Sequence, residues 1–555
     1  MMKKRSGATV VIAAGCVAVL GMAGCSANGA NATKTADGKP IVKVQVVKDA
    51  RLGKMDKLGW VKDLEKACDC KIQWQETAAN SWGQAKGAQL AAGDIADVTI
   101  GGYGTSDIAQ YSSLFMDLTP HLKDMPNLSK AFKEEPYGQV VSTQADGKIQ
   151  GSPNIAPTRE SNSSNHLFIN KTWLDKLGLP VPTTWDEYEA ALKAFKTGDP
   201  NGNGKQDEIP LDLNAAGTDG FGMFSMNVFV TSLGIPLSSS AGGTIGMYAK
   251  DGVVKNYLQD ERWKTTIQFL HRLWDDGVMS KDIFTHDWSQ YTGTAKNDQK
   301  TAIVGSSIMW TPSDLFGNAL GDQYITLPTL KASADQTEKT VWTFNGDDLK
   351  YQANKAVVKA NPANPEATLK LVDAFYSPDM SVQMTYGEFG ECVKKNGEND
   401  YTVLKPADKT KNAGDWMFSH ALADGAPVYL SRSMKVYNEN DEKETGVGVV
   451  DAVYAENYAN MNMNTDVLYS NMPITQKQQE TITANATGLN QMSMANFAKW
   501  VTEGGVEKDW DAYQQQLKDN KLEEDIKIQQ EIYDSYKARM EKLGVDLNTL
   551  VGAQH

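Results

Sequence analysis

Polar residues recur at alternate positions of the loop that starts at residue 199, and all but Lys205 carry a side-chain oxygen. The alternating set is Asp199, Asn201, Asn203, Lys205 and Asp207. With the main-chain carbonyl of Lys205, these oxygens fall on the first, third, fifth, seventh and ninth positions of a calcium loop. Gly204 falls on the sixth, where the sharp turn needs a positive φ. The pattern predicts a structural calcium ion in loop 199–210.

The twelfth position of this loop departs from the usual pattern. Pro210 stands where a bidentate glutamate is usual, and we expect Glu208, two residues earlier, to take that role. A turn rich in Gly, Asn and Asp that binds no metal is the alternative. No nearby residue has the character of a nucleophile, so a bound ion would stabilise the loop and would not catalyse a reaction.

The N-terminus has the features of a bacterial lipoprotein leader. Residues 1–5 are basic, residues 8–22 are apolar, and Met-Ala-Gly-Cys at 22–25 resembles a lipobox. We expect a signal peptide over 1–24, an acyl (palmitate) anchor on Cys25 and a flexible tether over 25–39. Cys16 is the competing cleavage position, and a cysteine without lipid is the other alternative. The mature body would then lie outside the cytoplasm, anchored to the cell membrane by lipid.

Composition excludes several classes of protein. The formal net charge is −14 and no basic stripe is visible, which argues against nucleic-acid binding. A chain of 555 residues with 41% hydrophobic content is large enough for two lobes.

In the body, Cys68, Cys70 and Cys392 are expected to be free thiols, because a bond within Cys-Asp-Cys would close a small ring.

Strand and helix patterns alternate over residues 41–101. Apolar alternation predicts strands at 41–47, 71–75 and 97–101, with amphipathic helices between them. A helix over 185–196 should begin with a capping box made by Thr184 and Glu187. Residues 301–310 have the pattern of a strand entering a loop, and about the last 130 residues are mostly helical. The fold class predicted is α/β with parallel strands.

Several blocks of sequence resemble one family, the extracellular solute-binding proteins of ABC importers, in the large subgroup with binders of alginate and rhamnogalacturonan fragments. The blocks are 90–97 (LAAGDIAD), 115–120 (FMDLTP), 146–153 (DGKIQGSP), 170–210 and 500–513, in the order of the family. The resemblance implies a periplasmic-binding-protein-like fold, in which two α/β lobes close by a hinge on a ligand in the cleft between them. It also implies that the calcium loop is a family feature, with Glu208 among its ligands. We expect one lobe at 40–157 and 300–352, and a helix-rich lobe at 158–299 and 353–555.

Aromatic residues in loop-like positions are the candidates for sugar contact, because sugars stack their apolar faces on rings and need polar partners for their hydroxyls. Trp310 is the leading candidate, since it directly follows a strand whose end the resemblance places at the cleft. The other candidates are Trp82, Tyr103, Trp288, Trp342, Trp416, Asn80, Asp94, Asp347, Asp348 and Glu388. Each of these tryptophans could instead be core packing. Many family members carry a G-x-E-G segment, whereas Glu388 here lies one place early, which leaves its role and that of Glu391 open.

The sequence predicts a solute receptor and no enzyme. It contains no H-E-x-x-H motif, nucleophile elbow or phosphate-binding glycine loop. We expect a monomer that binds an oligosaccharide and delivers it to an ABC permease. A surface glycoside hydrolase or lyase, an adhesin or structural lipoprotein, and a receptor for a non-sugar solute are the alternatives.

Overall fold

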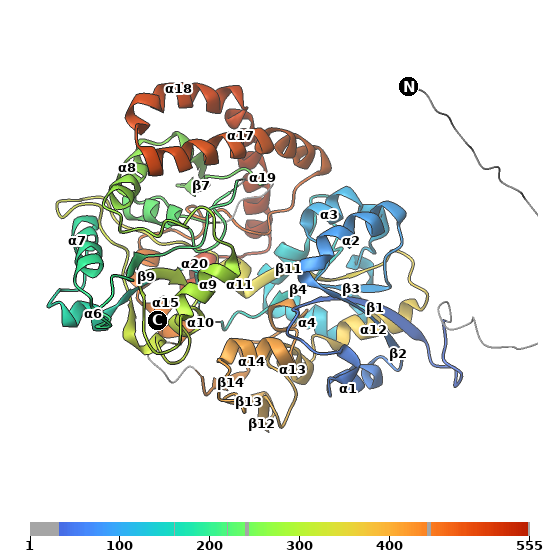
Figure 1. The fold of residues 1–555 in the computed structure, drawn as a ribbon. Helices are drawn as coiled ribbons and strands as arrows, with labels where there is room; N and C mark the ends of the chain where they lie inside the picture. The colour runs from blue at the N-terminus through green and yellow to red at the C-terminus, as the bar shows by residue number, and fades with distance from the viewer. Residues whose placement is uncertain (1–32, 160, 219, 239–242, 441–445, 553–555) are drawn as a thin grey trace, which may run out of the picture.

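The computed structural model describes residues 33–159, 161–218, 220–238, 243–440 and 446–552 (Figure 1). The signal peptide and Cys25 lie outside these residues. No helix in the described segments is both long and apolar enough to cross a membrane.

The first lobe is built on a five-stranded sheet with the order β2-β1-β3-β11-β4. Its strands are β1 (Ile41–Lys48), β2 (Lys71–Ala78), β3 (Val98–Ile100), β4 (Ser152–Ile155) and β11 (Tyr351–Val358). β1 is parallel to β2 and β3, and β11 is antiparallel to β3 and β4. The predicted parallel strand–helix alternation over 41–101 is therefore confirmed.

Helices cover this sheet and bury its alternating apolar side chains. They are α1 (Val61–Ala67), α2 (Ala79–Ala92), α3 (Thr105–Gln110), α4 (Pro126–Glu134), α5 (Pro136–Ser142), α12 (Pro365–Ala374) and α13 (Pro378–Tyr386). α12 packs against α1 and α4, and α5 packs against β4 and β11.

The second lobe contains a four-stranded sheet with the order β10-β5-β9-β6. Its strands are β5 (His166–Asn170), β6 (Ile209–Leu211), β9 (Val304–Met309) and β10 (Tyr324–Thr326), and a separate hairpin is formed by β7 (Met247–Lys250) and β8 (Val253–Asn256). Helices α6 (Lys171–Lys176), α7 (Trp185–Thr197), α8 (Glu261–Asp275), α9 (Trp288–Lys296), α10 (Pro312–Phe316) and α11 (Gly346–Lys350) belong to the same stretch of chain.

The C-terminal part of the chain is mostly helical, as predicted. Its helices are α15 (Val447–Ala452), α16 (Ala455–Ala459), α17 (Gln476–Glu503), α18 (Val506–Asp519), α19 (Leu522–Lys542) and α20 (Leu547–Gly552). α17 packs against α8 and α19 in the second lobe (Figure 1). α19 also reaches α5 of the first lobe, where the hydroxyls of Tyr536 and Tyr137 lie 3.1 Å apart. This helix therefore ties the two lobes together.

A small three-stranded sheet and one helix lie at the bottom of Figure 1, below the junction of the two lobes. The strands are β12 (Val393–Gly397), β13 (Asp400–Val403) and β14 (Lys435–Asn438), and the helix is α14 (Ala413–His420). We call these elements the small-sheet unit.

Strand pairing corrects the expected lobe boundaries. β9 and β10 were expected in the first lobe, but β5 lies between them and pairs with both in the second sheet. Conversely, β11 pairs with β3 and β4, and α12 packs against the first lobe, although residues after 352 were expected in the second. The chain crosses to the second lobe between β4 and β5 and returns between β10 and β11. Such non-local pairing leaves no periodic signal in the sequence.

The expected capping box of α7 forms only in part. The Thr184 hydroxyl accepts the Glu187 N–H at 3.2 Å, as predicted. The Glu187 carboxylate instead accepts the main-chain N–H and the hydroxyl of Thr183, each at 2.8 Å. Both contacts stabilise the first turn of the helix.

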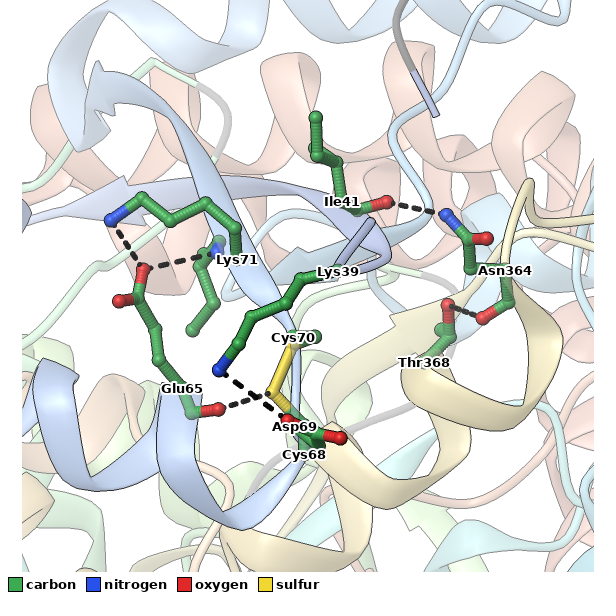
Figure 2. Close-up of a disulfide and its surroundings, with 10 residues drawn as sticks. Lys39, Ile41, Glu65, Cys68, Asp69, Cys70, Lys71, Asn364 and Thr368 are labelled. Carbon is green, nitrogen blue, oxygen red and sulfur yellow. Dashed lines mark hydrogen bonds and ion pairs between the residues drawn. A yellow bond between two sulfur atoms is a disulfide. The ribbon is translucent and has the colours of Figure 1, made fainter. Parts of the chain in front are cut away.

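Cys68 and Cys70 form a disulfide, which corrects the expectation of free thiols (Figure 2). The turn after α1 brings their Cα atoms to 5.1 Å, within the range that a disulfide bridges. Asp69 between them has a φ of +46°, a local conformation that allows the short ring to close. Cys392 is a buried free cysteine, so that part of the expectation agrees with the structure.

Candidate functional site

A cleft of about 1580 Å³ is lined by both lobes and by the small-sheet unit. The second lobe contributes Trp288 of α9 and the end of β9 with Trp310 and Asp314. Arg51 and Arg159 enter from the first lobe and its connection, and α14 contributes Trp416. The volume exceeds the roughly 300–1,000 Å³ of an ordinary small-molecule pocket, so the cleft suits an elongated ligand.

Trp310 lies at the end of β9, where the strand leaves the second sheet, and its side chain is only partly buried. Its main-chain carbonyl accepts a hydrogen bond of 2.8 Å from Nδ1 of His166, which is fully buried on β5. His166 Nε2 lies 3.2 Å from Asp451 Oδ1, and the imidazole stacks on Tyr454. A buried network thus fixes the backbone that carries the Trp310 ring.

Trp288 and Trp416 add two further rings to the cleft lining. Trp288 is 47% exposed at the first turn of α9 and packs against Phe224. Trp416 lies on α14 beside His420, with the Lys411 ammonium near its face. Three aromatic side chains from separate elements therefore present apolar surface to one cavity.

Asp314 places a carboxylate close to Trp310 in the chain. Thr311 caps α10, and its hydroxyl donates to Asp314 Oδ2 at 2.7 Å. Burial raises the pKa of Asp314, the negative charge of Asp415 raises it further, and Lys296 and Arg51 oppose this rise. Asp314 is thus a hydrogen-bonding group of the cleft lining, with the carboxylate of Asp415 and the cations Lys296 and Arg51 close enough to act on it.

Seven candidates from sequence do not line this cleft in the described part of the chain. They are Trp82, Tyr103, Asn80, Asp94, Trp342, Asp347 and Glu388. The rings of Trp82 and Tyr103 pack together in a separate buried cluster of the first lobe, and Asn80 and Asp94 are exposed. Local sequence could not show that these residues lie outside the cleft, because a tryptophan at the end of an element can pack in the core or line a surface.

Three of these candidates have other partners inside the protein. Trp342 is buried and stacks on Tyr454, with ring centroids 4.2 Å apart. Asp347 is buried and accepts the Ser470 N–H at 2.8 Å. Glu388 accepts the main-chain N–H of Gly59 at 2.8 Å.

Asp348, a polar candidate from the sequence, lines the cleft. The cleft also contains polar residues that the sequence did not indicate, and they include Arg51, Arg159, Asn165, Asn227, Asp314, Asn345, Asn412 and Asp415. These residues come from segments far apart in the chain, and only folding brings them together. Asparagine clusters in loops were the one available signal.

The loop over 199–208 has hydrogen bonds that gather its oxygens. The Asp199 carboxylate accepts the main-chain N–H groups of Asn203 and Gly204, each at 3.1 Å. The side-chain amides of Asn201 and Asn203 both donate to Asp207. Gly204 has a φ of +73°, the conformation expected at the sixth position of a calcium loop.

Glu208 gives the loop a feature that suits a cation. Its Oε1 atom is buried and has no hydrogen-bond partner among the described residues. Burial, the largest cause, and the nearby charges of Asp199 and Asp207 raise the pKa of Glu208. In the described segments, no three or more His, Cys, Asp or Glu side chains form a metal-holding group. A calcium ion here would therefore also need the asparagine and main-chain oxygens, and this mixed oxygen set is of the kind that calcium accepts.

Comparison with known proteins places the chain in a family. The family model of bacterial extracellular solute-binding proteins matches residues 59–390. An extracellular solute-binding protein of Bifidobacterium longum subsp. infantis is 37% identical, with a TM-score of 0.84 over 91% of this chain and 100% of that chain.

Two further relatives carry more specific descriptions. A structure described as an HMO-binding, ABC-transporter-associated solute-binding protein of B. longum infantis is 36% identical, with a TM-score of 0.82 over 90% of this chain and all of that one. The fructooligosaccharide ABC transporter substrate-binding protein FusA of Streptococcus pneumoniae is 27% identical over 496 residues, 86% of each chain. The two-lobed α/β fold, its wide cleft and these matches agree: the chain belongs to the bacterial extracellular solute-binding protein family.

Proposed function

We propose that this protein captures an oligosaccharide in the cleft between its lobes and delivers it to the permease of an ABC importer. The observation that carries this proposal is the cleft of about 1580 Å³, in which Trp288, Trp310 and Trp416 converge from three elements. Aromatic faces with polar groups between them are complementary to sugar rings and their hydroxyls. The relatives described as binding fructooligosaccharide and HMO support the same class of ligand.

Trp310 is proposed as the main stacking platform. Its backbone is held by His166, so the ring would keep its place with little loss of conformational entropy when the ligand binds. Asp314 and Asp348, with the asparagines of the lining, would accept or donate hydrogen bonds to hydroxyls. Closure of the lobes around the sugar would present both lobes to the permease.

A structural calcium ion is proposed in loop 199–208. Its ligands would be Asp199, Asn201, Asn203, Lys205 through its carbonyl, Asp207 and Glu208. When bound, the ion would crosslink the oxygens of the loop and compensate the buried negative charge of Glu208. The support is the orphaned Oε1 atom of Glu208 and the calcium-loop conformation at Gly204.

The mature protein is proposed to be a lipid-anchored monomer outside the cytoplasm. Cys25 would carry the lipid and residues 25–39 would form the tether. The family itself is extracellular. Globomycin treatment of expressing cells, followed by mass spectrometry of the N-terminus, tests the assignment of Cys25.

The proposal of capture without catalysis has a direct test. A panel of oligosaccharides is screened by thermal shift, and those that raise the melting temperature are measured by calorimetry. The binders are then incubated with the protein overnight and analysed by chromatography. Saturable binding with an unchanged ligand supports a receptor. Shortened products would favour the glycosidase or lyase, and binding by peptides alone would favour a different cargo.

A further inference from the structure

The charged side chains of the cleft are balanced. Among the described residues of the lining, six are basic and six are acidic. The basic ones are Arg51, Arg159, Lys296, Lys405, Lys409 and Lys411, and the acidic ones are Asp314, Asp322, Asp348, Asp415, Asp424 and Glu439. A site built for a polyanionic sugar needs an excess of positive charge, and this lining has none.

Both arginines of the lining are held by carboxylates of the protein itself. Arg51 lies between Asp49 and Asp415, with contacts of 2.8 Å from Nε and 2.6 Å from Nη1, and its guanidinium covers the Phe418 ring. Arg159 pairs with Asp424 at 2.7 Å and donates from Nη1 to the Leu349 carbonyl at 2.9 Å. Arginine recognises a ligand carboxylate through two parallel N–H donors. In both arginines, N–H donors are already bonded to carboxylates or to a carbonyl of the protein itself.

A carboxylate lines the cleft close to Trp310 in the chain. Asp314 follows Trp310 by four residues; burial and then the charge of Asp415 raise its pKa, and Lys296 and Arg51 oppose this rise. A sugar hydroxyl can donate to such a carboxylate, whereas a sugar carboxylate would be repelled by it.

We infer that the cleft selects an uncharged oligosaccharide and discriminates against uronic acids and other anionic sugars. This inference rests on the proposed function and narrows its ligand class. The cleft carboxylates act as acceptors for hydroxyl groups, and the pairs Arg51–Asp415 and Arg159–Asp424 keep the guanidinium groups from binding an anionic ligand.

The test compares matched ligands on the full mature chain. The tightest neutral binder of a panel of tri- to pentasaccharides is oxidised at C6 to the corresponding uronate, and both forms are measured by calorimetry. The oxidised form should bind at least about tenfold more weakly, because it brings a like charge to the site. Equal or tighter binding of the oxidised form, or a panel in which only oligouronates bind, would overturn the inference and leave the receptor function intact. Binding of neither class would contradict the receptor function itself.

A variant tests the role of the arginine pairing. Asp424→Asn removes the partner of Arg159, so it should increase affinity for the oxidised ligand several-fold and change affinity for the neutral one less. Asp511→Asn makes the same charge change at an exposed position of α18, outside the cleft, and should alter neither affinity. An oxidised ligand that binds both variants equally would overturn the assignment of the Arg159–Asp424 pair.

Discussion

His166 holds the main-chain carbonyl of Trp310 with a hydrogen bond of 2.8 Å from its Nδ1 atom. The same imidazole faces Asp451 through Nε2 at 3.2 Å, and it has no exposed surface. Asp451 in turn accepts the main-chain N–H groups of Asn162 and Ser163. The ring proposed to meet the sugar is therefore supported from behind by a rigid polar network, and its position does not depend on surface contacts alone.

The substitution His166→Phe should weaken both folding and binding. It keeps an aromatic ring beside Tyr454. It removes the hydrogen bond to the Trp310 carbonyl and the contact with one Asp451 oxygen. A buried unsatisfied acceptor costs about 1–3 kcal/mol, so urea unfolding should show a loss of that size. Ligand affinity should fall as the backbone of Trp310 becomes less fixed.

The matched control for this change is His121→Phe. His121 lies half-buried in the first lobe, and its ring makes no hydrogen bond to another described residue. Equal losses of affinity in the two variants would contradict the positioning role of His166.

Removal of calcium should destabilise the protein. EDTA is expected to lower the melting temperature and added calcium to restore it, because the ion would compensate the carboxylates of loop 199–208. Asp199→Asn should reduce this response sharply.

Asp298→Asn is the control for the calcium test. Asp298 also accepts two main-chain N–H groups in an exposed turn, from Lys300 and Thr301, but lies outside the loop. It should lose some stability and keep the full response to EDTA. If neither EDTA nor calcium changes the melting temperature of the wild-type protein, the loop binds no structural ion.

The Cys68–Cys70 disulfide should contribute little to stability, because its loop is so short that the chain loses little entropy in the unfolded state. Replacing both cysteines with serine should cost no more than about 1–2 kcal/mol of unfolding free energy on the chain-entropy estimate. Alkylation of the unfolded protein without reductant, followed by peptide mass spectrometry, should label Cys392 and leave Cys68 and Cys70 unmodified. Labelling of all three would contradict the disulfide.

Asp347 should make stability depend on pH. Burial, with a smaller effect of Asp348, raises the pKa of Asp347 from 3.8 to about 7. The folded state then holds this proton more tightly than the unfolded state, so the stabilisation is complete below about pH 4 and is lost as pH rises to about 7. Asp347→Asn carries no such proton, and its melting temperature relative to wild type should rise between about pH 4 and pH 7. The exposed variant Asp511→Asn should show a constant difference, and a constant difference for Asp347→Asn would contradict the assignment.

Local secondary structure could be predicted from the sequence, whereas the pairing of distant strands could not. The alternating apolar residues of β1 and the cap at Thr184 act over a few residues, so their patterns predicted the elements that form. The strands that pair with β9 are far away in the chain, and the residues 304–309 give no sign that β9 pairs with β5 and β6. Lobe boundaries inferred from order along the chain were wrong for this reason.

The candidate site shows the same difference between local features, which could be predicted, and long-range contacts, which could not. Trp310, Trp288 and Trp416 were candidates because the sequence favours a loop-like or element-end position for each, and all three line the cleft, although Trp416 lies within α14. Trp342 had the same local context but became buried against Tyr454. Arg51 and Asp415 are ordinary charged residues in the sequence, and they become neighbours in the cleft only because the small-sheet unit packs beside the first lobe.

Trp310 is proposed to supply the main contact surface for an oligosaccharide. Calorimetry of Trp310→Ala with the tightest neutral ligand tests it most directly, beside Trp74→Ala, which removes another partly buried tryptophan from β2, outside the cleft. Loss of a buried aromatic contact at the centre of a site costs about 2 kcal/mol or more, so Trp310→Ala should bind at least about tenfold more weakly. Trp74→Ala should bind as wild type does. Unchanged affinity in a folded Trp310→Ala protein would show that Trp310 is not the stacking platform.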